Sequence, residues 1–399
     1  MAFTKTTTTG YGTRVGNSLK GMVVGLILFI AATGLLFWNE GNYVKEKQAI
    51  GEAQAVAVPV ADVSKVDAGL NGKLIHATAK ADTKDVLTDD EFGASGVAIA
   101  LHRTVEYYQY EEKSTKKKKD NLGGSETTTE TFTYDKKWVS KPIDSSAFQD
   151  PEYKGKNTVL TTVEAKKQLA KDVSFGGYKL PPFLVEKIGG GESAEVKLSA
   201  SQKQALEKRA GPAGQVHVSG NTVYFGKNSG APEIGDVRVT LTKVPPADIS
   251  LIAKVNGQTF EEFVASNGRT FSRLAMGPVS KENMFQSAHD ENALLTWILR
   301  AVGVVLVIVG LRAMLGLLPT LLKVIPFLSG VVDVGITLIC LVFGLSWSLV
   351  IISIAWLFYR PIIGVPLVVV AILFMVYLKS LAKKKKAAAT PQEAPATPQ

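Results

Sequence analysis

The strongest pattern along the chain is a C-terminal block of almost uninterrupted apolar residues. Between residues 296 and 378, five side chains carry a charge: Arg300, Arg312, Lys323, Asp333 and Arg360. A helix needs about 20 apolar residues to cross a hydrocarbon layer of roughly 30 Å, and this block offers several such lengths in succession. It therefore predicts a membrane domain built from several helices.

Charges and prolines divide this block into predicted spans. Residues 294–311 form one span, residues 324–358 a span with an entry segment, and residues 361–378 the last span. Residues 312–323 are too short for a convincing span and contain Pro319. We expect them to form an amphipathic cytoplasmic connector at the membrane surface.

A separate apolar segment, residues 21–38, lies near the N-terminus. It ends without a small-residue cleavage site, which favours a retained anchor over a signal peptide and brings the predicted total to four spans. The positive-inside rule then places both termini in the cytoplasm. Residues 1–20 are expected to be a mobile cytoplasmic tail, residues 39–293 an extracytoplasmic domain, and residues 379–399 a basic, disordered cytoplasmic tail.

The outer domain shows the alternation of β-strands. Residues 73–80 and 97–111 alternate apolar and polar side chains, and residues 127–139 carry threonine and aromatic residues at strand spacing. The intervening residues 113–126 are charged and contain a Gly-Gly pair, so we predict a long hairpin with a solvated loop. An alternative for its lysines, residues 116–119, is contact with lipid headgroups or an acidic partner.

Together with further local signals, these patterns predict the fold class: a membrane protein with four transmembrane α-helices and a large β-rich (α+β) extracytoplasmic domain. They predict helices at residues 199–209 and 280–291, strands at 235–242 and 249–255, and hairpin turns at 219–221, 256–257 and 267–268.

The net charge of +9 changes this picture little. Much of it comes from residues 116–119 and 383–386, and the second run lies beside a predicted membrane end, where topology and anionic lipid explain it. We expect no nucleic-acid partner.

Candidate chemistry is sparse. The four histidines lack metal-site spacing, no Gly-x-Ser-x-Gly motif occurs, and the single cysteine, Cys340, excludes an intrachain disulfide. Asp89, Asp90 and Glu91 could bind a cation, but such a run between strands is usually a solvated loop. We assign no catalytic residue, metal or cofactor, and expect the protein not to be an enzyme.

The candidate site residues instead lie where the chain meets the membrane. Aromatic and charged side chains at span ends are typical interface anchors, and lysines beyond a span can contact anionic lipid. Asp333 is the one carboxylate of the block, and Arg312 or Lys323 could neutralise it. The predicted anchors are Trp38, Asn39, Glu40, Trp297, Arg300, Trp356, Tyr359, Arg360 and Pro361, and the predicted lipid-contacting lysines are Lys379, Lys383, Lys384, Lys385 and Lys386.

Several strings together resemble the LUMA family, transmembrane protein 43. They occur at residues 38–41 (WNEG), 105–110 (VEYYQY), 134–138 (YDKKW), 232–239 (PEIGDVRV), 296–301 (TWILRA) and 356–361 (WLFYRP). The resemblance implies four spans and a large extracytoplasmic domain. It also implies the behaviour of animal members, which lie in the endoplasmic reticulum and inner nuclear membrane, self-associate and organise membrane proteins. The lysine-rich loop and the Ala/Pro/Thr/Gln tail depart from the animal pattern and look bacterial.

These observations favour an integral membrane scaffold that forms homo-oligomers and arranges lipids or other membrane proteins. One alternative is a lipid-acting enzyme or transporter that uses Asp333. Another is an envelope sensor whose outer domain binds a ligand. We expect the bacterial cytoplasmic (inner) membrane, with the endoplasmic reticulum and inner nuclear membrane as the alternative location.

Overall fold

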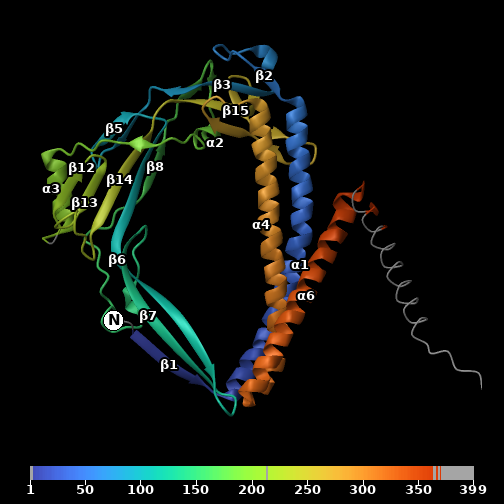
Figure 1. Ribbon diagram of the computed structural model, residues 1–399. Coiled ribbons are helices and arrows are strands. Elements are labelled where there is room, and N and C mark those ends of the chain that lie inside the picture. Colours follow the sequence, from blue (N-terminus) through green and yellow to red (C-terminus); the bar gives the residue numbers. More distant parts are fainter. Residues whose placement is uncertain (1–2, 213, 363–364, 367–368, 370–399) are drawn as a thin grey trace, which may run out of the picture. The chain divides into compact units, whose positions relative to one another are not determined.

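The computed structural model describes residues 3–212, 214–362, 365–366 and 369. They form two compact units, each assembled from separate parts of the chain (Figure 1). The described residues up to Thr13 and within Gln48–Asp290 form the β unit, and Arg14–Lys47 with the described residues from Glu291 onward form the helical unit. Helices α1 (Tyr11–Val56) and α4 (Lys281–Leu315) contribute residues to both units.

The larger sheet of the β unit has eight strands, and all of its pairings are antiparallel. In spatial order they are β1 (Phe3–Thr9), β7 (Glu126–Val139), β6 (Ala100–Asp120), β14 (Val237–Val244), β13 (Thr222–Phe225) and β12 (Val216–Ser219), with β11 (Glu192–Ser193) beside β14 and β8 (Lys166–Leu169) beside β6. Leu206 of helix α3 (Ala200–Ala210) packs with Val223 and Val239 of this sheet in one hydrophobic core.

The second sheet has seven strands and its own core. They are β10 (Tyr178–Lys179), β9 (Val173–Phe175), β3 (Leu74–Thr83), β15 (Ala247–Asn256) and β16 (Thr259–Glu261), with β19 (Arg273–Met276) beside β15 and β2 (Val58–Val60) beside β3. Phe175, Tyr178 and Leu184 are fully buried in this core, the last from helix α2 (Pro182–Val185). Two small sheets pair β4 (Val86–Asp89) with β5 (Ala94–Val97) and β17 (Phe263–Val264) with β18 (Thr270–Phe271).

A third cluster forms where the β-unit ends of α1 and α4 meet the second sheet. Ile50 and Ala53 of α1 pack with Phe285 of α4 and Ile252 of β15. The ring of Phe285 stacks on Phe271 with centroids 5.3 Å apart. Burial of aromatic and aliphatic side chains of this size contributes about 2 kcal/mol each, so this cluster holds both helix ends to the sheet.

Most local predictions in the outer domain are confirmed. The strands predicted at residues 73–80, 235–242 and 249–255 are β3, β14 and β15. Ser199 caps α3 in a capping box with Gln202, and the turn at residues 219–221 joins β12 to β13. The helix predicted at residues 280–291 is the start of α4.

The predicted loop at residues 113–126 is wrong for most of its length. Strand β6 continues to Asp120 and pairs with β7 as far as Glu126, leaving a short turn at residues 121–125. Lys116 and Lys118 form ion pairs with Glu130 and Glu126 of β7, which neutralises one face and allows the lysine run to form a strand. We call the outer part of this hairpin, residues 113–133, the arm.

The N-terminal segment expected to be a mobile tail is strand β1. It pairs with β7 along the arm in seven consecutive register pairs, from Phe3 with Phe132 to Thr9 with Glu126 (Figure 1). Tyr11 packs against Gly124 in the turn of the arm. The threonines of this segment lack a hydrophobic alternation, but β-branched residues fit a strand once a partner strand is present.

This pairing bears on the membrane topology expected from the sequence. Strand β1 precedes the apolar segment at residues 21–38, whereas β7 follows it. If that segment alone separates two compartments, β1 and β7 lie on opposite sides, and the charged arm cannot pass through hydrocarbon to reach β1. The β1–β7 pairing and a single crossing by α1 therefore exclude one another.

The helices of the helical unit approach one another closely at glycines. A Cβ atom added to Gly25 of α1 would lie 2.7 Å from the carbonyl oxygen of Gly310 of α4. Helix α6 (Pro326–Tyr359) joins this pair, with Gly344 against Ile308 of α4. Small residues at helix crossings permit such packing where lipid removes the hydrophobic driving force.

Within the described residues, three helical segments are long and apolar enough to cross a membrane: Tyr11–Val56, Lys281–Val324 and Ser329–Tyr359. The predicted connector is the end of α4 followed by the short helices α5 (Leu317–Leu321) and η3 (Leu322–Val324). The predicted entry segment and third span form one continuous helix, α6. Most of the fourth span and the basic tail lie outside the described residues.

The base of the arm is fixed by a polar and aromatic network. Tyr134 donates a hydrogen bond to Glu112 (2.5 Å) and accepts one from the backbone N–H of Asp150 (2.9 Å). Its ring stacks on Tyr153 with centroids 4.1 Å apart. Burial, together with the bond to Glu112, raises the pKa of Tyr134 to about 12.

We expect Cys pairs at Thr7 and Thr128, which are register partners, to crosslink within one chain in native membranes. The background is Cys340→Ala, and the product is an intrachain species on non-reducing gels after mild oxidation or treatment with a short bis-thiol reagent. Thr7→Cys with Thr127→Cys is the matched control, because these side chains leave opposite faces of the sheet. Equal, background-level yields for both pairs would rule out the β1–β7 pairing.

We expect the free energy of unfolding of the Tyr134→Phe variant to fall less steeply between pH 10 and about 12 than that of the unmodified chain. The folded state retains the Tyr134 proton above pH 10, where an unfolded tyrosine loses it, so its contribution is complete below that pH and disappears toward the folded pKa of about 12. At neutral pH the variant should lose about 1 kcal/mol. Thermal unfolding of the full chain in neutral detergent against pH measures both effects. Tyr153→Phe, which retains the stacked ring, should follow the unmodified chain; identical alkaline slopes for all three proteins would contradict this assignment.

Candidate functional site

The helical unit contains a buried ion pair between two predicted interface residues. Arg300 of α4 donates from Nε to Glu40 Oε1 (2.6 Å) and from Nη2 to Oε2 (2.8 Å). The Glu40 side chain is 0% exposed and that of Arg300 is 13% exposed. The bidentate geometry matches the planar guanidinium to the carboxylate, and each charge is accommodated because the other is present.

Helix α6 completes this group with aromatic and cationic side chains. Trp356 Nε1 donates to Glu40 Oε2 (2.8 Å), so the carboxylate receives hydrogen bonds from two helices. The Arg300 guanidinium lies 4.6 Å from the Trp297 ring centroid. Arg360 lies 4.4 Å from the centroid of Tyr43 and 5.5 Å from that of Trp356. Both arginines thus add cation–π contacts to the ion pair.

Polar side chains extend the same group along α1 and α4. Asn39 is buried and its Nδ2 donates to the carbonyl of Thr296 (3.1 Å). Asn292 Nδ2 donates to the carbonyl of Tyr43 (3.1 Å). Hydrogen bonds across helices replace hydration where water is excluded, and they fix the rotation of α1 against α4. We call the side chains of Asn39, Glu40, Tyr43, Asn292, Thr296, Trp297, Arg300, Trp356 and Arg360 the polar cluster.

The structure therefore brings together most predicted anchors while leaving two exposed. Trp38 is 55% exposed and Trp297 is 65% exposed. Tyr359 lies against Gly41, where an added Cβ would be 2.5 Å from the ring, and against Phe37. Pro361 follows the end of α6. Arg360 Nη2 is buried and donates to no acceptor among the described residues.

Sequence reasoning missed Tyr43 and Asn292. Each had a helical signal, because Tyr43 follows Asn39 by one turn and Asn292 precedes Thr296 by one turn. Polar residues at this spacing beside an apolar run indicate one polar face at a span end. The pairing of the two faces could not be predicted from the sequence, because it joins residues that are 257 and 249 positions apart.

Asp333 of α6 is ion-paired with Arg312 of α4, one of the two cations that the sequence offered. Arg312 Nε also donates to Thr337 Oγ1 (3.1 Å). The two charged side chains remain 30% and 44% exposed, unlike the Glu40–Arg300 pair. The predicted lipid-contacting lysines, from Lys379 to Lys386, lie outside the described residues.

In the β unit, carboxylates considered for a cation are held by arginine instead. Asp89 receives two hydrogen bonds from Arg103 (2.6 and 2.7 Å), and Glu91 receives one (2.6 Å). Arg103 also lies 4.6 Å from the Phe92 ring centroid. The guanidinium thus neutralises both carboxylates. No group of three or more potential ligands is arranged for a metal ion in the part of the chain that the structure describes.

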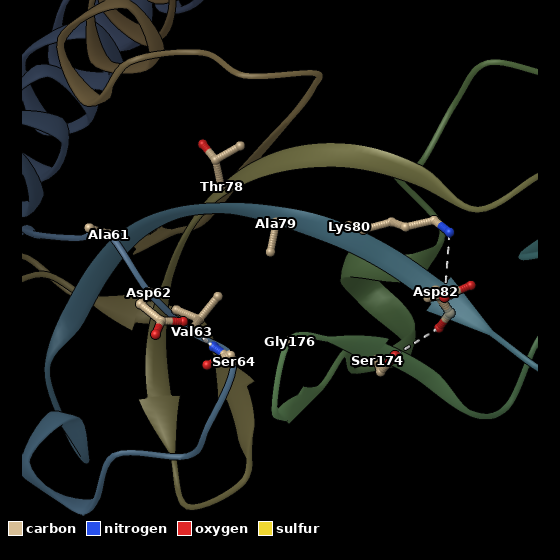
Figure 2. Close-up of a pocket in the computed structure, with 10 residues that line it drawn as sticks. All are labelled: Ala61, Asp62, Val63, Ser64, Thr78, Ala79, Lys80, Asp82, Ser174 and Gly176. Atoms are coloured by element: carbon tan, nitrogen blue, oxygen red, sulfur yellow. Dashed lines mark hydrogen bonds and ion pairs between the residues drawn. The ribbon is translucent and has the colours of Figure 1, made fainter.

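Three adjoining pockets follow β3 and β9 of the second sheet. The one in Figure 2, about 340 Å³, is lined by Lys80 and Asp82 of β3, Ser174 of β9 and the loop bearing Asp62 and Ser64. Its polar groups bond mainly to one another: Lys80 pairs with Asp82 (3.5 Å), and Ser64 N–H donates to Asp62 (2.8 Å). This arrangement provides a polar groove without a converging catalytic set.

Comparison with known proteins places these features in a family. The family model described as Transmembrane protein 43 matches residues 107–361, which include the whole arm and the α4 and α6 parts of the polar cluster. The human Transmembrane protein 43 is 28% identical over 364 residues, covering 88% of each chain. The Transmembrane protein 43 homolog of Drosophila melanogaster is 26% identical over 354 residues, covering 85% of this chain and 89% of its own. No solved structure matches the chain significantly.

We expect Arg300→Ala to destabilise the helical unit by about 3–5 kcal/mol, because it leaves the Glu40 carboxylate buried and unpaired. Arg300→Lys should lose less, since it keeps the charge but not the bidentate geometry. Tryptophan fluorescence during unfolding in mixed micelles reports the change through Trp297 and Trp356.

Two further variants separate this effect from general helix damage. Arg312→Ala removes the partly exposed pair with Asp333 and should cost about 1 kcal/mol or less. The double variant Glu40→Gln/Arg300→Leu should be more stable than Arg300→Ala, because no charge remains buried. Equal losses for Arg300→Ala and Arg312→Ala would show that burial of the Glu40 pair has no special weight.

Proposed function

Because this integral membrane protein belongs to the transmembrane protein 43 family, we propose that it is a scaffold. In this proposal copies of the chain associate and arrange other membrane proteins or lipids around them. The polar cluster keeps three helices in one fixed arrangement, as a scaffold requires. The β unit supplies the surface through which copies meet.

The observation that carries self-association is the free edge of strand β1. This strand ends the order of the larger sheet, and among the described residues it has no strand on its outer side. It is seven residues long, contains no proline, carries one charge at Lys5, and is exposed from Thr4 to Thr8. An edge of this length, with one lysine as its protecting charge, is a template for pairing with another strand.

The environment of Asp333 supports a scaffold rather than chemistry at this residue. A lipid-acting enzyme or transporter built on Asp333 would need its carboxylate free to exchange a proton or bind a cation. Here the carboxylate is held by Arg312, which is itself positioned by Thr337. Such a pair ties α4 to α6.

We expect the chain, extracted gently into nanodiscs, to have a protein mass that is a multiple of 42.8 kDa by light scattering and particle imaging. Thr6→Lys/Thr8→Lys should reduce that mass, because two β1 edges brought together would then oppose like charges. The mass is the direct measurement.

The matched control places a lysine on the opposite edge of the same arm, away from β1. Thr115→Lys lies on β6, which has β7 on one side, so it adds charge without altering the β1 edge. It should leave the assembly intact. A monomeric unmodified chain would end the self-association proposal, whereas equal dissociation by both variants would move the interface away from β1.

A further inference from the structure

The run of four lysines on β6 is divided by the alternation of the strand. Lys116 pairs with Glu130 (3.3 Å) and Lys118 with Glu126 (3.1 Å), so these two side chains share one face of the arm with carboxylates. Lys117 and Lys119 leave the opposite face. In the described part of the chain neither has an ion pair or a hydrogen bond from its ammonium group.

The face that carries Lys117 and Lys119 is otherwise formed by hydroxyl groups. Lys117 is the register partner of Thr129, and Lys119 that of Thr127. Strand β1 extends the surface, because its pairing with β7 places further threonines in the same rows. We call this surface the lysine–threonine face; it consists of Lys117, Lys119, Thr4, Thr6, Thr8, Thr115, Thr127, Thr129 and Thr131.

No carboxylate lies on this face of the arm beyond Lys113. Asp120, Glu126 and Glu130 belong to the opposite face by register. At the base, Asp135 is on the same side but is paired with Lys113 (2.7 Å). The arm therefore separates its charges, with ion pairs on one face and only cations and hydroxyl groups on the other.

We propose that the lysine–threonine face binds the phosphate-bearing headgroups of an anionic bilayer. Ammonium groups and threonine hydroxyls both donate hydrogen bonds to phosphate oxygens, and no carboxylate on the face repels them. The face is already exposed to water, so the lysines need not be buried to make these contacts. Lysines near an anionic surface are attracted to it over roughly 10 Å at ordinary salt concentrations.

The bilayer is the favoured partner because the chain itself keeps the arm near one. Thr9, the last residue of β1, lies only about 12 residues before Gly21, the first residue of the apolar segment, and a helix of that length covers about 18 Å. Lipid headgroups are therefore present at high local concentration, whereas a soluble acidic protein would have to be recruited. The inference needs no self-association, so it stands or falls separately from the proposed function.

The experiment compares two faces of one strand pair in the intact protein. Thr129→Cys reports on the lysine–threonine face and Thr128→Cys on the opposite face, each in the Cys340→Ala background. The full chain is placed in nanodiscs of neutral phosphatidylcholine, or of the same lipid with about 30 mol % phosphatidylglycerol. The rate of labelling by a water-soluble maleimide is measured at low salt and at about 0.5 M salt.

We expect labelling at Thr129→Cys to slow by about threefold or more in anionic nanodiscs and to recover at high salt, with no change at Thr128→Cys. Lys117→Gln/Lys119→Gln should abolish the effect. Lys116→Gln/Lys118→Gln removes the same charge from the same strand and should preserve it. Unchanged thermal unfolding of each variant shows that the arm remains folded.

Adding anionic vesicles to protein in neutral nanodiscs tests whether the face can bind a second membrane. Slower labelling only on vesicle addition would still support lipid binding, with an opposing bilayer as the source. Equal labelling at Thr129→Cys under all lipid conditions would overturn the proposal and leave an acidic protein as the partner to seek. The proposal would also be overturned if both double variants, Lys117→Gln/Lys119→Gln and Lys116→Gln/Lys118→Gln, lost the slowing of Thr129→Cys labelling equally. The effect would then depend on the total charge of the arm and not on one face.

Discussion

An ion pair between a carboxylate and a guanidinium that are both removed from solvent constrains the position of every helix that contributes to it. Glu40 is fully buried, and its stability depends on two hydrogen bonds from Arg300 and one from Trp356. These three residues come from α1, α4 and α6, so the ion pair can form only if all three helices have the correct rotation and depth. The close approach of Gly25 to Gly310 and of Tyr359 to Gly41 satisfies that geometric condition from the packing side.

Different interactions stabilise the two units. The β unit buries large apolar side chains in two sheet cores and joins the helix ends to one of them through Phe285. The helical unit exposes many of its apolar side chains, which is appropriate where lipid is the solvent, and depends on glycine contacts and buried polar groups for its specificity. Different substitutions should therefore damage the two units.

Elements with a local signal could be predicted from the sequence, and those that depend on a distant partner could not. The capping box of Ser199 and Gln202 and the Asn256-Gly257 turn are complete within a few residues. Strand β1 lacked such a signal, because its only partner lies more than 100 residues away. The lysine run was misread as a loop because the neutralising Glu126 and Glu130 belong to another strand. The anchors were identified by residue type and position, whereas the ion pair of Glu40 with Arg300 required the fold.

The alternation of side chains along the arm also means that the length of β6 decides which lysines form ion pairs. Because successive side chains leave opposite faces, deleting one residue in β6 between its base and Lys116 would exchange the two lysine pairs. Lys117 and Lys119 would then meet Glu130 and Glu126, and the formerly paired lysines would face the threonines. Either arrangement contains two ion pairs and two lysines without a carboxylate partner. The surface should therefore tolerate such a one-residue shift in register better than the substitution of a single glutamate.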